Sequence, residues 1–187
     1  EAARVEIFAE WMSLEGEIKK DIILAATLHD FNKKQEILGL REVANSGVSA
    51  VIRVLYEMEE EKNKILREAG FDKSLIWLVG ASGALPETLI EIKNILDKKN
   101  LTPEDMVFLI IHYVDAYTRN ENWVEPATLE ENDLDRRVIG NTKYGELDSA
   151  IILERFPNEP IFKGRTASET MGFLGHKIEF IFAKIIF

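Results

Sequence analysis

The sequence predicts an all-α domain of about seven helices. Apolar residues recur at the period of a helix in nearly every segment, and no stretch alternates as a strand would beyond chance. A length of 187 residues suits one domain that buries a full core without covalent staples. Hydrophobic residues make up 46% of the chain and charged residues 30%, a composition that argues against a disordered protein.

The first two predicted helices span residues 1–13 and 17–31. One face of the first is apolar, and the second is apolar until it ends in the pair His29-Asp30. Because the chain begins with Glu1 inside or next to a helix, we expect the natural N-terminus to lie before this residue.

Residues 40–68 are expected to form one long helix or two abutting helices. Apolar and small residues share one face of this stretch: Leu40, Val43, Ala44, Gly47, Val48, Val51, Leu55 and Met58. The charged run 57–64 predicts a solvated face. Gly70 marks the end, since glycine commonly stops a helix.

A loop of small residues, 80–85, follows a short apolar segment at 75–79. Pro86 suits the first turn of the next helix, where its missing N–H has no partner in any case. Small residues let a ligand approach the backbone, so this loop and Glu87 are a candidate pocket wall. The loop lacks the Gly-Lys-Ser/Thr ending of phosphate-binding loops, and the alternative is a packed connection between helices.

The helix that Pro86 opens is expected to run to about Lys98. The next helix begins at Thr102, where a hydroxyl cap, a proline and two acids form a typical helix start, and it runs to about Thr118. Residues 119–141 are polar and irregular, and further helices are expected over 144–156 and about 167–187. The prediction is a single domain, residues 1–187, with a core over about 1–120 and a C-terminal helical extension over about 121–187.

Charge and composition restrict the partners. A net charge of −10 argues against a protein that holds nucleic acid by neutralising phosphates, although a nucleotide can still bind in one basic pocket. The absence of Cys excludes disulfides and thiolate zinc sites. No apolar run is long enough for a membrane helix and there is no signal-peptide pattern, so we expect a cytoplasmic protein. The apolar C-terminal helix either packs inside or pairs with a second copy as a homodimer.

The chemistry-bearing residues lie at the ends of two apolar segments. His29 and Asp30 close one helix, and His112 and Asp115 lie three residues apart on another, so that they share a face. Burying carboxylates is costly, and two of them on neighbouring helices repel unless a cation lies between them. Imidazole and carboxylate ligands suit Mn, Mg, Fe, Ni or Zn. The alternative is that these pairs arise by chance in a plain helical interaction protein.

The stretch from Ala25 to Lys33 resembles the second motif of the HD-domain phosphohydrolase superfamily, in which an apolar helix ends in His-Asp and a lysine follows. The stretch 110–117 resembles the last motif, an apolar helix with one Asp, here Asp115. The resemblance spans roughly residues 1–120 and implies an all-α fold and a metal-dependent phosphohydrolase. Its substrate would be a nucleotide or another small phosphate ester.

The resemblance also implies a ligand set, with two departures from the family pattern. His29, Asp30 and Asp115 would hold one divalent metal ion. Asn32 stands where glycine is common, and no His precedes His29, so the family's first ligand would lie at or before the start of this chain. If that ligand is truly lost, the chain is a degenerate module that binds a metal or nucleotide without turnover.

Four further residues are candidates for the substrate. Lys33 follows His29 by four residues and, if the helix continues, points toward the same mouth to hold phosphate charge. Arg119 lies four residues after Asp115 and can reach phosphate in the same way. His112 is a candidate either for contact with the substrate or for contact with a residue that binds the metal. Glu87, in the first turn of the helix after the small-residue loop, is the fourth candidate.

Overall fold

The computed structural model describes residues 2–83, 85–119, 122–123, 138–139 and 142–186. It confirms the all-α class. In chain order the elements are α1 (Ala2–Trp11), α2 (Gly16–Leu28), α3 (Lys33–Val43), α4 (Val48–Glu68), α5 (Lys73–Val79), the 3-10 turn η1 (Gly80–Ser82), α6 (Pro86–Leu96), α7 (Pro103–Tyr117), strands β1 (Thr118–Arg119), β2 (Asn122–Trp123), β3 (Val138–Ile139) and β4 (Thr142–Lys143), α8 (Tyr144–Arg155), the 3-10 turn η4 (Pro160–Phe162) and α9 (Ala167–Ile186). The strands form two antiparallel pairs of two residues each.

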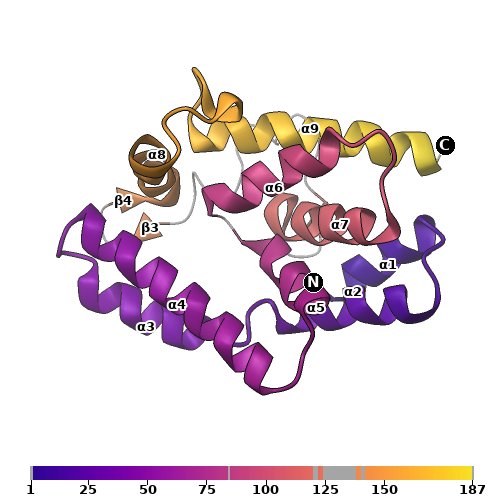
Figure 1. The fold of residues 1–187 in the computed structure, drawn as a ribbon, viewed down its shortest axis with the longest axis horizontal. Coiled ribbons are helices and arrows are strands. Elements are labelled where there is room, and N and C mark those ends of the chain that lie inside the picture. Colours follow the sequence, from indigo (N-terminus) through magenta and orange to yellow (C-terminus); the bar gives the residue numbers. More distant parts are fainter. Residues whose placement is uncertain (1, 84, 120–121, 124–137, 140–141, 187) are drawn as a thin grey trace.

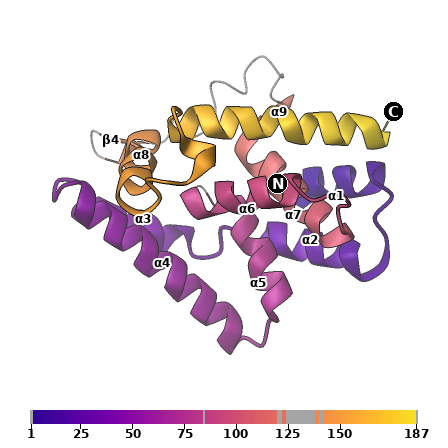
Figure 2. The same cartoon turned by 45° about the horizontal axis from the view of Figure 1, so that its top comes forward.

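Helix α7 is the centre of the fold, and 11 of its 15 residues are buried. It contacts α1, α2, α5, η1 and α9, and both views place it among these elements (Figures 1 and 2). Aromatic rings join three of the helices, since Phe8 of α1 packs against Tyr113 of α7 and Phe182 of α9. A helix that is apolar on all sides is stable only where other elements cover it, which is the position that α7 occupies.

Of the two alternatives predicted for residues 40–68, one long helix or two abutting helices, the structure shows two helices, and the first begins seven residues earlier than expected. Helix α3 begins at Lys33, and the chain turns back between Val43 and Val48, so that α3 and α4 pack as a hairpin. Gly47 has a φ of 92°, in the region that favours glycine, and it directly precedes α4. Its place in the apolar pattern concealed this turn.

Two helix starts are capped by side chains that bond in both directions. At α7, the Asp105 amide donates to the Thr102 hydroxyl, and the Thr102 amide donates to the Asp105 carboxylate, with distances of 3.2 and 3.0 Å. Thr166 and Glu169 do the same at the start of α9. Such capping boxes satisfy amides that have no partner in the first turn, which explains why the start at Thr102 is predictable from sequence.

The hairpin of α3 and α4 lies on one side of the molecule, next to α8 (Figures 1 and 2). A small core of its own holds it there, and this core joins Leu40, Val51 and Val54 to Leu147 of α8. The larger core gathers the remaining helices around α7. A site between these two cores therefore receives residues from helices that are distant in the sequence.

Candidate functional site

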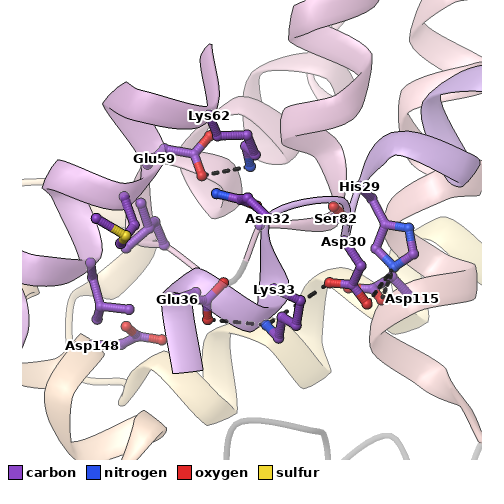
Figure 3. A pocket seen from close by; sticks show the side chains of 14 residues that line it. His29, Asp30, Asn32, Lys33, Glu36, Glu59, Lys62, Ser82, Asp115 and Asp148 are labelled. Carbon is purple, nitrogen blue, oxygen red and sulfur yellow. Dashed lines mark hydrogen bonds and ion pairs between the residues drawn. The ribbon is translucent and has the colours of Figure 1, made fainter. Parts of the chain in front are cut away.

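The site is a pocket between the hairpin of α3 and α4 and the end of α2, with α7 and α8 as further walls. Figure 3 shows its polar residues pointing toward a common space. The cavity volume is about 80 Å³, which is enough for several water molecules or for a small anion together with a metal ion. The lining residues are His29, Asp30, Asn32, Lys33, Glu36, Leu55, Met58, Glu59, Lys62, Ser82, Gly83, Leu85, Asp115 and Asp148.

His29 directly follows α2 and points one edge of its ring into the pocket. Its Nδ1 lies 2.7 Å from the carbonyl oxygen of Ala26, one turn back along the same helix. A carbonyl can only accept, so Nδ1 carries the proton of this hydrogen bond. The other ring nitrogen, Nε2, faces the pocket, and it is the atom through which a neutral histidine of this tautomer binds a metal.

Two carboxylates face this nitrogen. Nε2 of His29 lies 3.1 Å from Oδ2 of Asp30 and 3.8 Å from Oδ1 of Asp115 (Figure 3). The side chains of His29 and Asp115 are mostly buried, with 13% and 16% of their surface exposed, whereas Asp30 is more than half exposed. Because a lone pair and two carboxylates repel one another, this arrangement needs a proton on Nε2 or a cation nearby.

The donor set suits a divalent cation, and the spacing fits it in part. Two ligand atoms each about 2.1 Å from one ion lie roughly 3.0–3.4 Å apart at octahedral or tetrahedral angles. The distance from His29 to Asp30 falls in that range, and the distance of 3.8 Å to Asp115 exceeds it. Accordingly, within the described ranges no three His, Asp or Glu side chains already form a group that could hold a metal ion.

Lys33 lies in the pocket, although the reason expected from the sequence is wrong. Helix α2 ends at Leu28, and Lys33 is the first residue of α3, so no continuous helix aligns it with His29. The turn at 29–32 brings it back instead. Its Nζ lies 3.9 Å from Asp30 and 3.0 Å from Glu36, between the histidine end of the pocket and α3 (Figure 3).

Four charged residues of the pocket were not predicted from the sequence: Glu36, Glu59, Lys62 and Asp148. The run 57–64 was expected to be a solvated face, but Lys62 is only 6% exposed. Its position was detectable, because Lys62 continues the spacing of Val51, Leu55 and Met58 along α4. Asp148 is 1% exposed on α8. No sequence signal marks Asp148, because its place depends on how α8 packs.

His112 is not among the pocket residues. It is 1% exposed, and its Nδ1 lies 3.0 Å from the carbonyl oxygen of Ala81 in η1. Its Nε2 is buried without a hydrogen-bond partner in the described part of the chain. Burial lowers the pKa of His112 to about 4. His112 thus supports η1, the segment that leads to Ser82 and Gly83 in the pocket.

The buried, neutral state of His112 predicts a loss of stability in acid. An unfolded histidine titrates near pH 6.5 and the folded one near 4, so between these values the unfolded state binds more protons and the free energy of unfolding falls as the pH falls. The slope from this group approaches about 1.4 kcal/mol per pH unit. Urea unfolding of the wild type and of His112→Gln between pH 4 and 7 measures it. Equal slopes in both proteins would refute the assignment.

The other predicted substrate residues lie elsewhere. Glu87 does not line this pocket. Its carboxylate accepts from the Tyr56 hydroxyl at 2.8 Å and lies 3.4 Å from Arg155, so it ties α6 to α4 and α8. Arg119 lies in β1, directly after α7, and its side chain is outside the described part of the structure.

No family model, curated protein or solved structure matches this chain. In the described ranges no single helix is both long enough and apolar enough to span a membrane.

Proposed function

We propose that this protein is a metal-dependent phosphohydrolase that acts on a nucleotide or another small phosphate ester. The observation that supports it most is the convergence of Nε2 of His29 with the carboxylates of Asp30 and Asp115. The resemblance of the segments around these three residues to HD-domain phosphohydrolase motifs supports the same reaction.

His29, Asp30 and Asp115 would hold one divalent ion of the Mn, Mg, Fe, Ni or Zn group. A divalent ion in such a site lowers the pKa of a bound water and polarises a phosphoryl oxygen. The hydrogen bond from His29 to Ala26 keeps the ring in the tautomer that leaves Nε2 available. Lys33 places an ammonium group beside Asp30, where it can hold phosphate charge.

The pocket favours a small substrate group over a polymer. A cavity of about 80 Å³ accommodates a phosphoryl group, while the net charge of −10 opposes binding along a nucleic-acid backbone. We place this activity in the cytoplasm, in line with the absence of Cys.

Turnover of phosphate esters with added metal tests the proposal. The purified protein is stripped with a chelator and then assayed with nucleoside monophosphates, diphosphates and bisphosphates, cyclic nucleotides and p-nitrophenyl phosphate, each with Mn, Mg, Fe, Ni or Zn. We expect release of phosphate or ring opening with at least one metal and none after chelation. Equal rates with and without metal, or no turnover of any ester, would contradict it.

The second candidate is a degenerate module that binds a metal or nucleotide without turnover. The wide spacing of 3.8 Å between Nε2 of His29 and Oδ1 of Asp115 favours it. Metal content of the purified protein separates this candidate from a plain helical interaction protein, because only the module retains a metal that His29→Ala removes.

A further inference from the structure

Lys62 is a buried lysine on α4, a helix whose other ion pairs lie in solvent. It is 6% exposed, and its Nζ lies 2.6 Å from Glu59, one turn earlier on α4. The same helix makes two ion pairs, Arg53 with Glu57 and Lys64 with Glu68, in which every side chain is more than half exposed. An ion pair on α4 can therefore form in solvent, so the stability of the helix does not explain why Lys62 is buried.

The pocket explains where the lysine goes. Lys62 and Glu59 line the same cavity as His29, but from the wall that α4 forms (Figure 3). Lys33, on the adjoining helix α3, is the second lysine of this lining. One ammonium group thus lies near Asp30 and Glu36, and the other lines the cavity from a different wall.

Both ammonium groups are held by carboxylates that an anion could replace. Lys33 lies 3.0 Å from Glu36, and Lys62 lies 2.6 Å from Glu59, whose side chain is 32% exposed. A phosphate offers more acceptor oxygens and more negative charge than a carboxylate. Because Lys62 is buried, this difference in charge has more effect there than it has in water.

We propose that Lys62 binds a second phosphate group of the substrate, beyond the one that lies near His29 and Lys33. The substrate class is then a compound with two phosphate groups, either a diphosphate or a bisphosphate, and not a simple monoester. This inference rests on the proposed function for the identity of the first phosphate site, and it adds which substrates that site prefers.

The competing explanation is that Lys62 only offsets the acids around it. Glu36, Glu59, Asp115 and Asp148 also line the cavity, and a lysine among them reduces their repulsion. The two explanations differ in one measurable respect. An anion-binding lysine discriminates between ligands with one and two phosphate groups, whereas a lysine that only balances charge does not.

Equilibrium binding distinguishes them without any turnover. Isothermal titration calorimetry measures the dissociation constants of inorganic phosphate, pyrophosphate and propane-1,3-diyl bisphosphate for the full chain. Each is measured without metal and at one fixed Mg²⁺ concentration. The variants are Lys62→Met, Glu59→Gln and the matched control Lys64→Met, an exposed lysine of the same helix. Circular dichroism and thermal unfolding establish that each variant is folded.

We expect the wild type and Lys64→Met to bind pyrophosphate or the bisphosphate at least tenfold more tightly than phosphate, roughly the effect of one charge-assisted hydrogen bond. Lys62→Met should lose this preference and keep its affinity for phosphate within about twofold, since the first site stays intact. Glu59→Gln should strengthen the preference, because Lys62 loses its competing carboxylate. This variant keeps the test decisive if Lys62→Met does not fold. Tighter binding of pyrophosphate would identify the substrate class as a diphosphate, and tighter binding of propane-1,3-diyl bisphosphate would identify it as a bisphosphate.

The inference is overturned if the wild type does not discriminate between one and two phosphate groups, or if Lys62→Met and Glu59→Gln leave the preference unchanged. Failure of the proposed function has a different signature. A protein that hydrolyses no ester but shows the Lys62-dependent preference refutes the enzyme and retains the anion site. One that hydrolyses esters without that preference retains the enzyme and refutes the role of Lys62.

Discussion

Replacing His29 by alanine is expected to abolish metal-dependent phosphate release. Its Nε2 is the atom nearest to both the Asp30 and the Asp115 carboxylates, so the variant leaves these two carboxylates without the imidazole between them. Residues that only orient metal ligands change affinity or activity about 10–100-fold, and loss of a ligand itself should exceed that range. Initial rates and metal content after dialysis, measured on the same samples, check the prediction. Asp115→Ala should give the same loss.

The chain offers a matched control for this substitution. His176 lies on α9 with about half of its side chain exposed, 3.8 Å from Glu179 and outside the pocket. His176→Ala should keep both the activity and the metal content within about twofold of the wild type, as is usual for exposed positions without special contacts. If His29→Ala retained its metal and its rate, the assignment of the site to this histidine would be refuted.

Gly175→Ala is expected to destabilise the protein, although it places a better helix former in a helix. Inside a helix, alanine is more favourable than glycine by about 1 kcal/mol of helix propensity. At Gly175, however, a Cβ atom would lie 2.7 Å from Cζ of Tyr117. That ring is 1% exposed, and its hydroxyl donates to the carbonyl oxygen of Met171, so it has little room to move. Overpacking of a tight core costs about 1–3 kcal/mol, and the clash should prevail.

Urea unfolding at pH 7 measures this effect, and Gly80→Ala is the control. Gly80 has helical backbone angles, with φ of −68°, and a Cβ there would meet nothing within 4 Å. Gly80→Ala should therefore stabilise the protein by about 0.4–1 kcal/mol. The two glycine variants should change the free energy of unfolding in opposite directions. A gain in stability for Gly175→Ala would show that α9 and α7 are packed less closely than the distance to Tyr117 indicates.

The positions of most helices were predictable because local signals mark them. The Thr102 cap and Pro86 announce helix starts through contacts within one turn, and the apolar period of α7 reflects burial on all sides. The sequence left open whether residues 40–68 form one helix or two, because Gly47 fits an apolar stripe as well as it fits a turn. A pattern of side chains alone does not distinguish a continuous helix from two helices that bury the same face.

The pair His29-Asp30 and the single Asp115 stand out in the sequence because scarce or charged residues follow long apolar runs, and this chemistry is legible without coordinates. Their separation, and the presence of Lys62 and Asp148 in the same pocket, depend on how α4 and α8 pack against α2 and α7. Local sequence determines which face of a helix is apolar, but the neighbour that covers this face is chosen by packing across the whole chain. The tertiary structure therefore decided that Glu87 ties three helices together, that His112 supports η1 from the core, and that a lysine from an apparently solvated run faces the pocket.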